Sequence, residues 1–302
     1  MTPSDAITHC GLVTLAGRPN VGKSTLLNSL VGQKISITSP RAQTTRHRLL
    51  GIKTAGHAQA IYVDTPGLHE GGKGTMNRHL NKVAGASLQG VDCIVLMIDA
   101  NGWTQEDERP LQMAAKQKIP VILVINKIDQ LKDRDQLLPL MEQSSLKMAF
   151  SDIVPVSARA GTNVDDLEKT ILRYLPEQPA LYPADVVTDR GGRFLAAELV
   201  REQIFRGFQQ EVPYSTAVSI EQFSRTKGTL HIEATIWVER EGQKPILIGK
   251  DGQQIKTIGS RARLAMQKMF ATKVHLNLWV KVREGWSDNE KLLRSLGYTD
   301  ES

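Results

Sequence analysis

Residues Gly17–Ser24 read Gly-Arg-Pro-Asn-Val-Gly-Lys-Ser and match the phosphate-loop pattern G-x-x-x-x-G-K-[ST]. The pattern requires a preceding strand and a following helix. The apolar run Gly11–Ala16 and the amphipathic stretch Lys23–Val31 predict both. Glycines let backbone N–H groups curl around phosphate oxygens, and the helix N-terminus adds partial positive charge. The predicted phosphate contacts are Gly17, Arg18, Pro19, Asn20, Val21, Gly22, Lys23, Ser24 and Thr25.

A second motif, Asp64-Thr-Pro-Gly67, begins forty residues after Ser24, at the end of a predicted strand. In phosphate-loop enzymes the lysine places its charge on the β- and γ-phosphates and the loop hydroxyl ligates Mg²⁺. We expect Asp64 to hold the Mg²⁺ shell through water, and the Gly67 N–H to face the γ-phosphate. The predicted contacts from this motif are Asp64, Thr65, Pro66 and Gly67.

A threonine between these motifs is expected to complete the Mg²⁺ shell. The run Gln43-Thr-Thr-Arg46 offers Thr44 and Thr45, of which we favour Thr45. The first switch segment is expected at Ile35–His47 and the second from Asp64 to about Val83, where three glycines favour mobility. The three glycines are Gly71, Gly72 and Gly74. The predicted catalytic residues are Lys23, Thr45 and Gly67.

A guanine-reading motif, Asn126-Lys-Ile-Asp129, follows the apolar run Val121–Ile125. Asp129 can accept hydrogen bonds from guanine N1–H and from its amine, whereas adenine would leave the carboxylate unpaired. Asn126 either pairs with the base or ties its loop to the phosphate loop. Ser157-Ala158 follows another strand end and can offer a backbone N–H to guanine O6. The predicted base site is Asn126, Lys127, Asp129, Ser157, Ala158 and Arg159.

The first half of the chain alternates strand-like and helix-like segments, which predicts an α/β domain at residues 8–176 with a mostly parallel, six-stranded sheet flanked by helices. The predicted strands Arg48–Ile52 and Ala58–Val63 are joined by a connection too short for a helix, so we expect them to form a hairpin. One edge strand of the sheet is therefore expected to be antiparallel. The predicted strands are Gly11–Ala16, Arg48–Ile52, Ala58–Val63, Cys93–Asp99, Val121–Ile125 and Ile153–Val156. The predicted helices are Lys23–Val31, Asn77–Gln89, Gln105–Lys118, Gln136–Phe150 and Val164–Tyr174.

Length and composition agree with a two-domain protein. The chain has 302 residues, a formal net charge of +6 and two cysteines, Cys10 and Cys93. Both cysteines lie in apolar runs, so we expect buried thiols and a reducing, cytosolic compartment. No apolar window is long enough to span a membrane, and Met1–Thr8 does not resemble an export signal.

A proline-containing stretch separates the two halves, and we place a linker at residues 177–192. A second, α+β domain is expected at residues 193–302. Its predicted elements are a helix at Arg193–Phe208, strands at Ser215–Phe223 and Thr229–Glu239, a helix at Gln253–Phe270, a strand at Lys273–Arg283 and a short terminal helix at Ser287–Leu296.

The second domain carries a concentrated positive charge. Lys244–Arg283 contains nine basic residues and one acidic residue, Asp251. Such a field favours an anionic polymer or surface as the partner, although a solvated basic face without a partner is the simpler alternative. The same region contains the turn Gly249-Lys-Asp-Gly252, with an apolar segment before it and a basic helix after it.

This second domain resembles the type II KH domains, in which a GxxG turn clamps the backbone of about four nucleotides. Ile248, Ile255 and Ile258 could line an apolar groove under the bases, although packing in a hydrophobic core would explain these three isoleucines equally well. The predicted RNA contacts are Ile248, Gly249, Lys250, Asp251, Gly252, Ile255, Lys256, Ile258, Arg261 and Arg263.

The half-chain Gly11–Tyr174 resembles the translation-factor-class GTPases and, through its Thr-Thr-Arg and Asp-Thr-Pro-Gly-Leu runs, their TrmE-Era-EngA branch. Leu68 stands where Ras-like enzymes carry the glutamine that orients the attacking water, so slow intrinsic hydrolysis is expected. Asn20 occupies the position that helps some members of this branch bind K⁺. Our hypothesis is that K⁺ supplies charge in the role of an arginine finger; alternatively, Asn20 only braces the loop.

Together the two halves resemble the Era family over nearly the whole chain. The resemblance implies GTP/GDP and Mg²⁺ as ligands, and binding of small-subunit (16S) ribosomal RNA near its 3′ end. It also implies a role in maturing the 30S subunit, and a monomer in the cytoplasm with peripheral contact on the inner face of the cell membrane. One alternative is an RNA-modifying enzyme, which residues 181–302 disfavour because they lack cysteine. Another is a membrane-associated cell-cycle regulator whose basic domain binds anionic lipid.

Overall fold

The computed structural model describes residues 7–41, 44–67, 75–289 and 293. The described residues fall into two units. The first unit contains the described residues within 1–36, 45–72 and 80–189. The second unit contains the described residues within 37–44, 73–79 and 190–302.

The first unit is built on a six-stranded sheet in the order β2-β3-β1-β4-β5-β6. β2 is antiparallel to β3, and the other neighbouring strands are parallel. This confirms the predicted sheet, including its antiparallel edge. The strands are β1 (His9–Gly17), β2 (Leu49–Ala55), β3 (Ala58–Asp64), β4 (Cys93–Asp99), β5 (Val121–Asn126) and β6 (Asp152–Val156).

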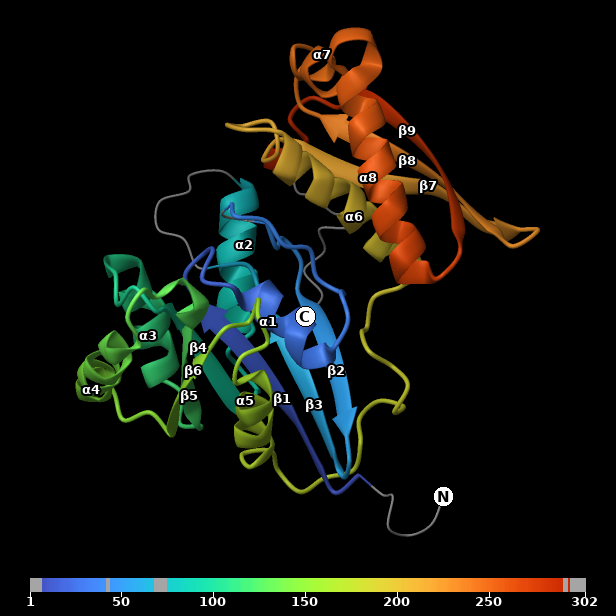
Figure 1. Cartoon of the computed structure of the whole chain (residues 1–302). Coiled ribbons are helices and arrows are strands. Elements are labelled where there is room, and N and C mark those ends of the chain that lie inside the picture. The colour runs from blue at the N-terminus through green and yellow to red at the C-terminus, as the bar shows by residue number, and fades with distance from the viewer. Residues whose placement is uncertain (1–6, 42–43, 68–74, 290–292, 294–302) are drawn as a thin grey trace. The chain divides into compact units, whose positions relative to one another are not determined.

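Helices lie on both faces of this sheet (Figure 1). Every residue of β4 and β5 is consequently buried, which explains why both strands read as continuous apolar runs rather than alternating ones. The helices are α1 (Lys23–Val31), α2 (Thr75–Ala86), α3 (Gln105–Ala115), α4 (Leu137–Lys147) and α5 (Val164–Leu172).

The parallel arrangement brings the predicted motifs to one edge of the sheet, because parallel strands all end on the same side. In the strand register Leu15 pairs with Asp64, and Asp99 pairs with Asn126. Asn126 in turn pairs with Val156, directly before Ser157. Motifs from distant parts of the chain therefore follow strand ends at the same edge of the sheet.

The expected linker runs along the first unit for most of its length. The backbone N–H of Ile52 donates to Val187 O at 2.9 Å, and that of Leu50 donates to Asp189 Oδ1 at 2.9 Å. Tyr182 and Val186 pack against the apolar cluster of β1, β2 and β3. The unit boundary falls after Asp189, within the range predicted for the linker.

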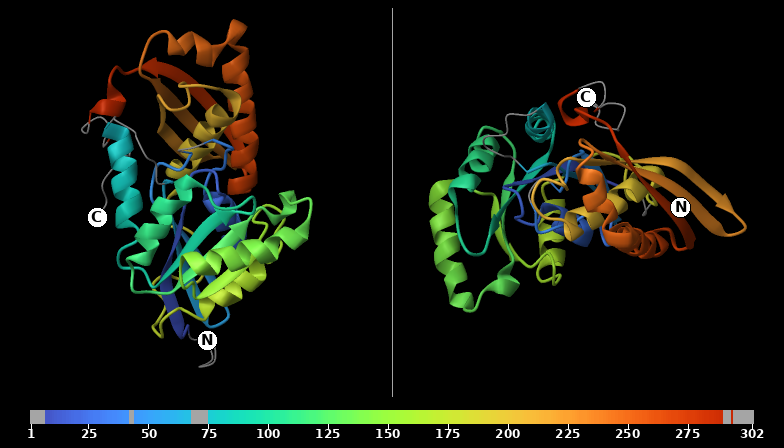
Figure 2. Two further views of the ribbon diagram at one scale, coloured as in Figure 1. Left: turned by 90° about the vertical axis from the view of Figure 1, so that its left-hand side faces the viewer. Right: turned by 90° about the horizontal axis from the view of Figure 1, so that it is seen from above.

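The second unit has the element order α-β-β-α-α-β, as expected for a type II KH domain. Its three strands lie in the order β7-β8-β9, with β7 antiparallel and β9 parallel to β8. The β7–β8 hairpin extends beyond the helices (Figure 2). The elements are α6 (Gly192–Gly207), β7 (Thr216–Thr226), β8 (Thr229–Val238), α7 (Gln243–Ile248), α8 (Gln253–Phe270) and β9 (Lys273–Val282). Helix α7 was expected only as an apolar segment.

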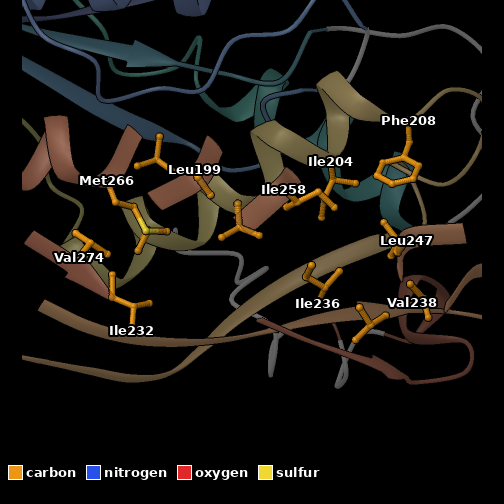
Figure 3. Packing of buried hydrophobic residues seen from close by; sticks show 14 of the residues in the cluster. Leu199, Ile204, Phe208, Ile232, Ile236, Val238, Leu247, Ile258, Met266 and Val274 are labelled. Carbon is orange, nitrogen blue, oxygen red and sulfur yellow. The ribbon is translucent and has the colours of Figure 1, made fainter. Parts of the chain in front are cut away.

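The core of the second unit lies between its sheet and helices α6 and α8 (Figure 3). Leu199 of α6 and Met266 of α8 meet side chains of β8 such as Ile236. Ile258 of α8 is 3% exposed and belongs to this core. The prediction that its side chain lines an RNA groove was therefore wrong, and core packing accounts for it.

The structure bears on the two cysteines and on the length of the apolar helices. Cys10 and Cys93 are free and buried, and burial raises the pKa of Cys93 to about 12. Neither thiol is reactive in such surroundings. Among the described residues, no helix has the length and apolar character needed to cross a bilayer. Of the expected terminal helix, residues 290–292 and 294–296 lie outside the described ranges.

Candidate functional site

The phosphate loop connects β1 to α1 and depends on glycine for its shape. Gly22 has φ 110°, and Asn20 has φ 61°, so both lie in the left-handed region. A Cβ at Gly22 would lie 2.3 Å from Asn126 Nδ2. The loop therefore packs directly against the guanine-reading motif, and glycine is required there for both space and backbone conformation.

Lys23 begins α1, and its side chain folds back over the loop. Its Nζ donates to Gly17 O at 3.0 Å and to Arg18 O at 2.9 Å. The residue is 7% exposed, and burial lowers the pKa of its ammonium group to about 8. An anionic phosphate at this loop would meet a desolvated cation, which is a strong electrostatic partner.

Three oxygen-bearing side chains meet beside the loop. Ser24 Oγ donates to Asp64 Oδ2 at 2.8 Å and lies 2.8 Å from Thr45 Oγ1. Asp64 is fully buried, which raises the pKa of its carboxyl group, and its Oδ1 makes no hydrogen bond to any described residue. Hydroxyl and carboxylate oxygens are the ligands that Mg²⁺ prefers, and a buried carboxylate oxygen without a donor fits a cation site.

The same contacts separate the two candidate threonines. Thr44 Oγ1 donates to Arg41 O at 2.8 Å and lies 2.6 Å from Ser39 Oγ, so it is engaged away from the carboxylate. Thr45 is the one beside Ser24. Ser36, for which the sequence offers no signal, donates to Asp64 Oδ2 at 2.8 Å.

Gly67 lies against the phosphate loop. A Cβ at this position would come within 2.9 Å of Pro19 Cγ and 3.0 Å of Pro19 N. Thr65 Oγ1 donates to Leu15 O at 3.4 Å, which holds the start of the motif on β1. The predicted positions Gln43, Leu68, Gly71, Gly72 and Gly74 lie outside the described residues.

Asn126 braces three loops, its own, the phosphate loop and the loop after β6. Its Nδ2 donates to Val21 O at 2.8 Å, and its Oδ1 accepts from the Ala158 N–H at 3.0 Å. Of the two roles left open for Asn126, the structure shows the tie to the phosphate loop. Of the pair Ser157-Ala158, which was expected to offer a backbone N–H to guanine O6, the Ala158 N–H donates to Asn126 in this structure.

Asp129 is exposed on a 3₁₀ turn, Ile128–Gln130, one residue after the end of β5. Ser157 Oγ donates to Asp129 Oδ1 at 2.6 Å, which orients the carboxylate. The Ser157 backbone N–H is bonded to Thr162 O, so this loop is itself closed. A carboxylate held in this way can read the N1–H and amine edge of guanine. The predicted residue Arg159 is exposed beside this loop.

Two acidic residues that the sequence did not single out hold the cations of the site. Lys127 Nζ lies 2.8 Å from Asp99 Oδ2, and Arg18 Nε lies 3.2 Å from Asp107 Oδ1. Burial raises the pKa of Asp99, but the bonds from Lys127 and Asn101 outweigh it and lower the pKa below its usual value. The position of Asp99 at a strand end was a signal that could have identified it.

Part of the expected first switch belongs to the second unit, where it packs against α6. Glu202 is fully buried and accepts from the Thr38 N–H at 3.2 Å and from Arg206 Nη2 at 2.9 Å. Arg201 is 1% exposed and donates to Thr44 O. Sequence reasoning missed Glu202 and Arg201 because α6 reads as an ordinary helix.

The GxxG turn of the second unit forms a 3₁₀ segment, Lys250–Gly252, between α7 and α8. Gly249, Asp251 and Gly252 have φ values of 72°, 52° and 73°. Lys250 and Asp251 are exposed, which suits a turn that approaches a nucleic-acid backbone.

Other predicted RNA contacts divide into two groups. The basic residues Lys256, Arg261 and Arg263 are exposed on α8. Ile248 and Ile255 are partly buried and pack against the core, whereas Ile246, which was not predicted, is 50% exposed. Ile246 is thus a better candidate than Ile258 for contact with bases.

Comparison with protein families matches the two units separately. Residues 12–127 match the family described as "50S ribosome-binding GTPase", and residues 211–287 match the family described as "KH domain".

Known proteins resemble the chain over its full length. A relative named GTPase Era, from Haemophilus influenzae (strain PittGG), is 52% identical over 302 residues, with 100% of both chains covered. The structure of a point variant of Aquifex aeolicus Era bound to GDP·AlF4⁻ matches with a TM-score of 0.92 and 44% identity, covering 96% of this chain and 99% of that one. The structure of Era with MgGDPNP and nucleotides 1506–1542 of 16S ribosomal RNA matches with a TM-score of 0.93 and 44% identity, covering 97% and 99%.

Proposed function

The chain belongs to the Era family of GTPases, and from this premise we propose a GTP-dependent RNA-binding switch. In this proposal it binds the 3′ end of small-subunit ribosomal RNA and assists maturation of the small subunit. The single observation that carries the proposal is the presence, in one chain, of the nucleotide site and an exposed GxxG turn. Support comes from the Era structure that contains both MgGDPNP and 16S nucleotides.

The geometry suggests how the site hydrolyses GTP. Lys23 and the N–H groups of the phosphate loop would stabilise the charge that develops on the phosphates. Ser24 and Thr45 would ligate Mg²⁺, with Asp64 holding its shell through water. Mg²⁺, when bound, neutralises phosphate charge. Because residue 68 is leucine, we propose that the intrinsic rate is slow.

Raising the pH from 7 to 8.5 is expected to weaken GDP binding about fourfold, because Lys23 loses its proton near its lowered pKa of about 8. Bound phosphates would raise that pKa again. Below pH 8, Lys23 is charged with or without nucleotide, and affinity is constant. Above pH 8, binding must first return a proton to Lys23, and affinity falls. Titration with fluorescent GDP at a series of pH values measures how the affinity depends on pH.

Two variants control this measurement. Lys23→Ala should bind GDP weakly, with an affinity that does not change between pH 7 and 8.5. Lys118→Ala, at an exposed position far along the chain, should keep the pH dependence of the wild type. If wild-type affinity does not change over this range, the titrating group is not Lys23.

We also propose that Asn20 helps to bind K⁺ beside the phosphates. Asn20 is exposed on the phosphate loop and has a left-handed backbone, which places it at the surface of the loop. Hydrolysis should be faster in KCl than in NaCl at equal ionic strength, and Asn20→Ala should remove the difference. Equal rates in the two salts for the wild type would contradict the proposal.

Filter binding tests the proposed function as a whole. The full chain is loaded with GDP or with a non-hydrolysable GTP analogue, and titrated with an RNA matching the 3′ end of small-subunit ribosomal RNA, with a scrambled RNA as control. We expect tighter binding with the GTP analogue and a preference for the matching RNA. Affinity that does not depend on the nucleotide would contradict the switch and leave the KH assignment intact.

Anionic vesicles added to the same assay test the second candidate, a cytoplasmic regulator held peripherally on the inner membrane. One observation favours it: Leu264 is 59% exposed on the basic helix α8. The other apolar residues of α8 are either buried in the core, as Ala262 and Met266 are, or partly buried and packed against it. Binding to vesicles without binding to RNA would favour this function over the first.

A further inference from the structure

The sheet of the second unit has one face turned away from its core. Along β9, Val274 and Val280 are buried, while alternate residues point to the opposite face, as the two-residue period of a strand requires. We call this opposite side the outer face and define it by the outward positions of β8 and β9. These positions are Thr229, His231, Glu233, Thr235, Trp237, Lys273, His275, Asn277, Trp279 and Lys281.

Two tryptophans lie diagonally on the outer face, because Trp279 pairs with Thr235 and Lys281 pairs with Trp237. Trp279 is 42% exposed, which is unusual for so large an apolar side chain. The indole N–H of Trp237 donates to Ser219 Oγ at 2.8 Å, so this ring is held in one orientation. The outer face therefore presents aromatic surface that needs little further ordering on binding.

Two cations lie over the Trp237 ring. Lys281 Nζ lies 5.9 Å from the centre of the Trp237 ring, and the Arg283 guanidinium carbon lies 5.7 Å from it. At the far end of the face is Lys273, followed by His231 and His275, whose rings are 5.6 Å apart. Glu233 is the one acidic residue among the ten outward positions. Lysines therefore outnumber acidic residues among these ten positions, and His231, His275 and Asn277 can form hydrogen bonds.

We propose that the outer face binds unpaired RNA bases, as a second contact separate from the GxxG turn. Exposed aromatic rings with interleaved cations match the two parts of a single strand, since bases stack on rings and phosphates pair with cations. A duplex would offer only its phosphates, because its bases are already stacked. The exposed polar and charged side chains of the face, such as His275 and Lys281, distinguish it from an apolar protein-docking patch.

The proposal rests on the proposed RNA-binding function and extends it. β9 is the edge strand of the sheet, and α7, which leads into the GxxG turn, packs against it. An RNA strand leaving the turn needs only to pass around β9 to reach Trp279. We therefore expect unpaired RNA that is long enough to reach both the GxxG turn and the outer face to bind more tightly than RNA that reaches only the turn.

The test uses the full chain and three RNAs: an unpaired 6-mer, an unpaired 20-mer containing it, and a duplex of the 20-mer. Trp279→Ala should weaken binding of the 20-mer on the order of tenfold and leave the 6-mer unchanged. Trp279→Phe should keep most of the affinity, because phenylalanine also stacks. Leu264→Ala removes another exposed apolar side chain, on α8 rather than on the outer face, and serves as the matched control.

The outcomes separate this proposal from the function on which it rests. If the wild type binds none of the RNAs, the RNA-binding function itself fails. If the wild type binds and Trp279→Ala leaves the 20-mer unchanged, or weakens both unpaired RNAs equally, the outer-face proposal is overturned alone. Unaltered GTP hydrolysis and thermal unfolding in Trp279→Ala establish that the variant is folded.

Discussion

Lys23→Ala is expected to lower kcat for GTP hydrolysis by at least about 10²-fold. Lys23 is a buried cation whose Nζ is already positioned by Gly17 O and Arg18 O. A group positioned in advance stabilises charge as it develops, without reorganising during the reaction. Single-turnover phosphate release, measured with enough excess enzyme to bind all of the GTP, separates this loss from weaker binding.

The matched control is Lys118→Ala, which removes an exposed lysine from the same unit and should leave kcat unchanged. A fall in affinity with kcat within a few-fold of the wild type would show that Lys23 only binds the nucleotide. The pH-dependent affinity would then remain, but the catalytic role would not.

Asp129→Asn is expected to weaken GDP binding by at least about 10²-fold and to shift preference towards XDP. The carboxylate accepts two donors from guanine, and an amide replaces one acceptor with a donor that faces the guanine amine. Xanthine carries an oxygen at that position and accepts from the new donor. The Ser157 Oγ bond at 2.6 Å can be retained by the asparagine oxygen, so the loop should keep its shape.

Competition between GDP and XDP for a fluorescent nucleotide measures the shift. Asp135→Asn makes the same chemical change at an exposed position six residues away and should have no effect. If Asp129→Asn binds GDP as tightly as the wild type, the base is read by other groups and the assignment of Asp129 is wrong.

The order of strands and helices could be predicted because the residues that specify it are local. β4 and β5 read as apolar runs, and the hairpin of β2 and β3 followed from the short connection at Gly56–His57. Helix α7 was missed because six residues around Pro245 are too few to show a helical period. The contact of Val186–Asp189 with β2 was missed because an edge strand accepts any extended segment, whatever its side chains.

The same distinction applies to the site. Lys23, Ser24, Asp64 and Asp129 could be predicted because phosphate, Mg²⁺ and guanine each require one residue type at one spacing. The roles of Asn126 and Ala158 could not be settled, because each can bond either to a ligand or to the other. The sequence could not show that Ile258 is buried and Ile246 exposed, because the burial of an isoleucine depends on the tertiary packing around it.

The ligand chemistry of this chain can be read from its residues in order, since a phosphate loop and a guanine-reading carboxylate are defined by contiguous positions. Three features needed the folded chain: the threonine that stands beside Ser24, the acidic residues that hold Arg18 and Lys127, and the exposure of Trp279 on the outer face. The difference is one of range. Backbone conformation and residue type act over a few neighbouring positions, whereas burial and pairing depend on residues that the sheet register brings together from distant parts of the chain.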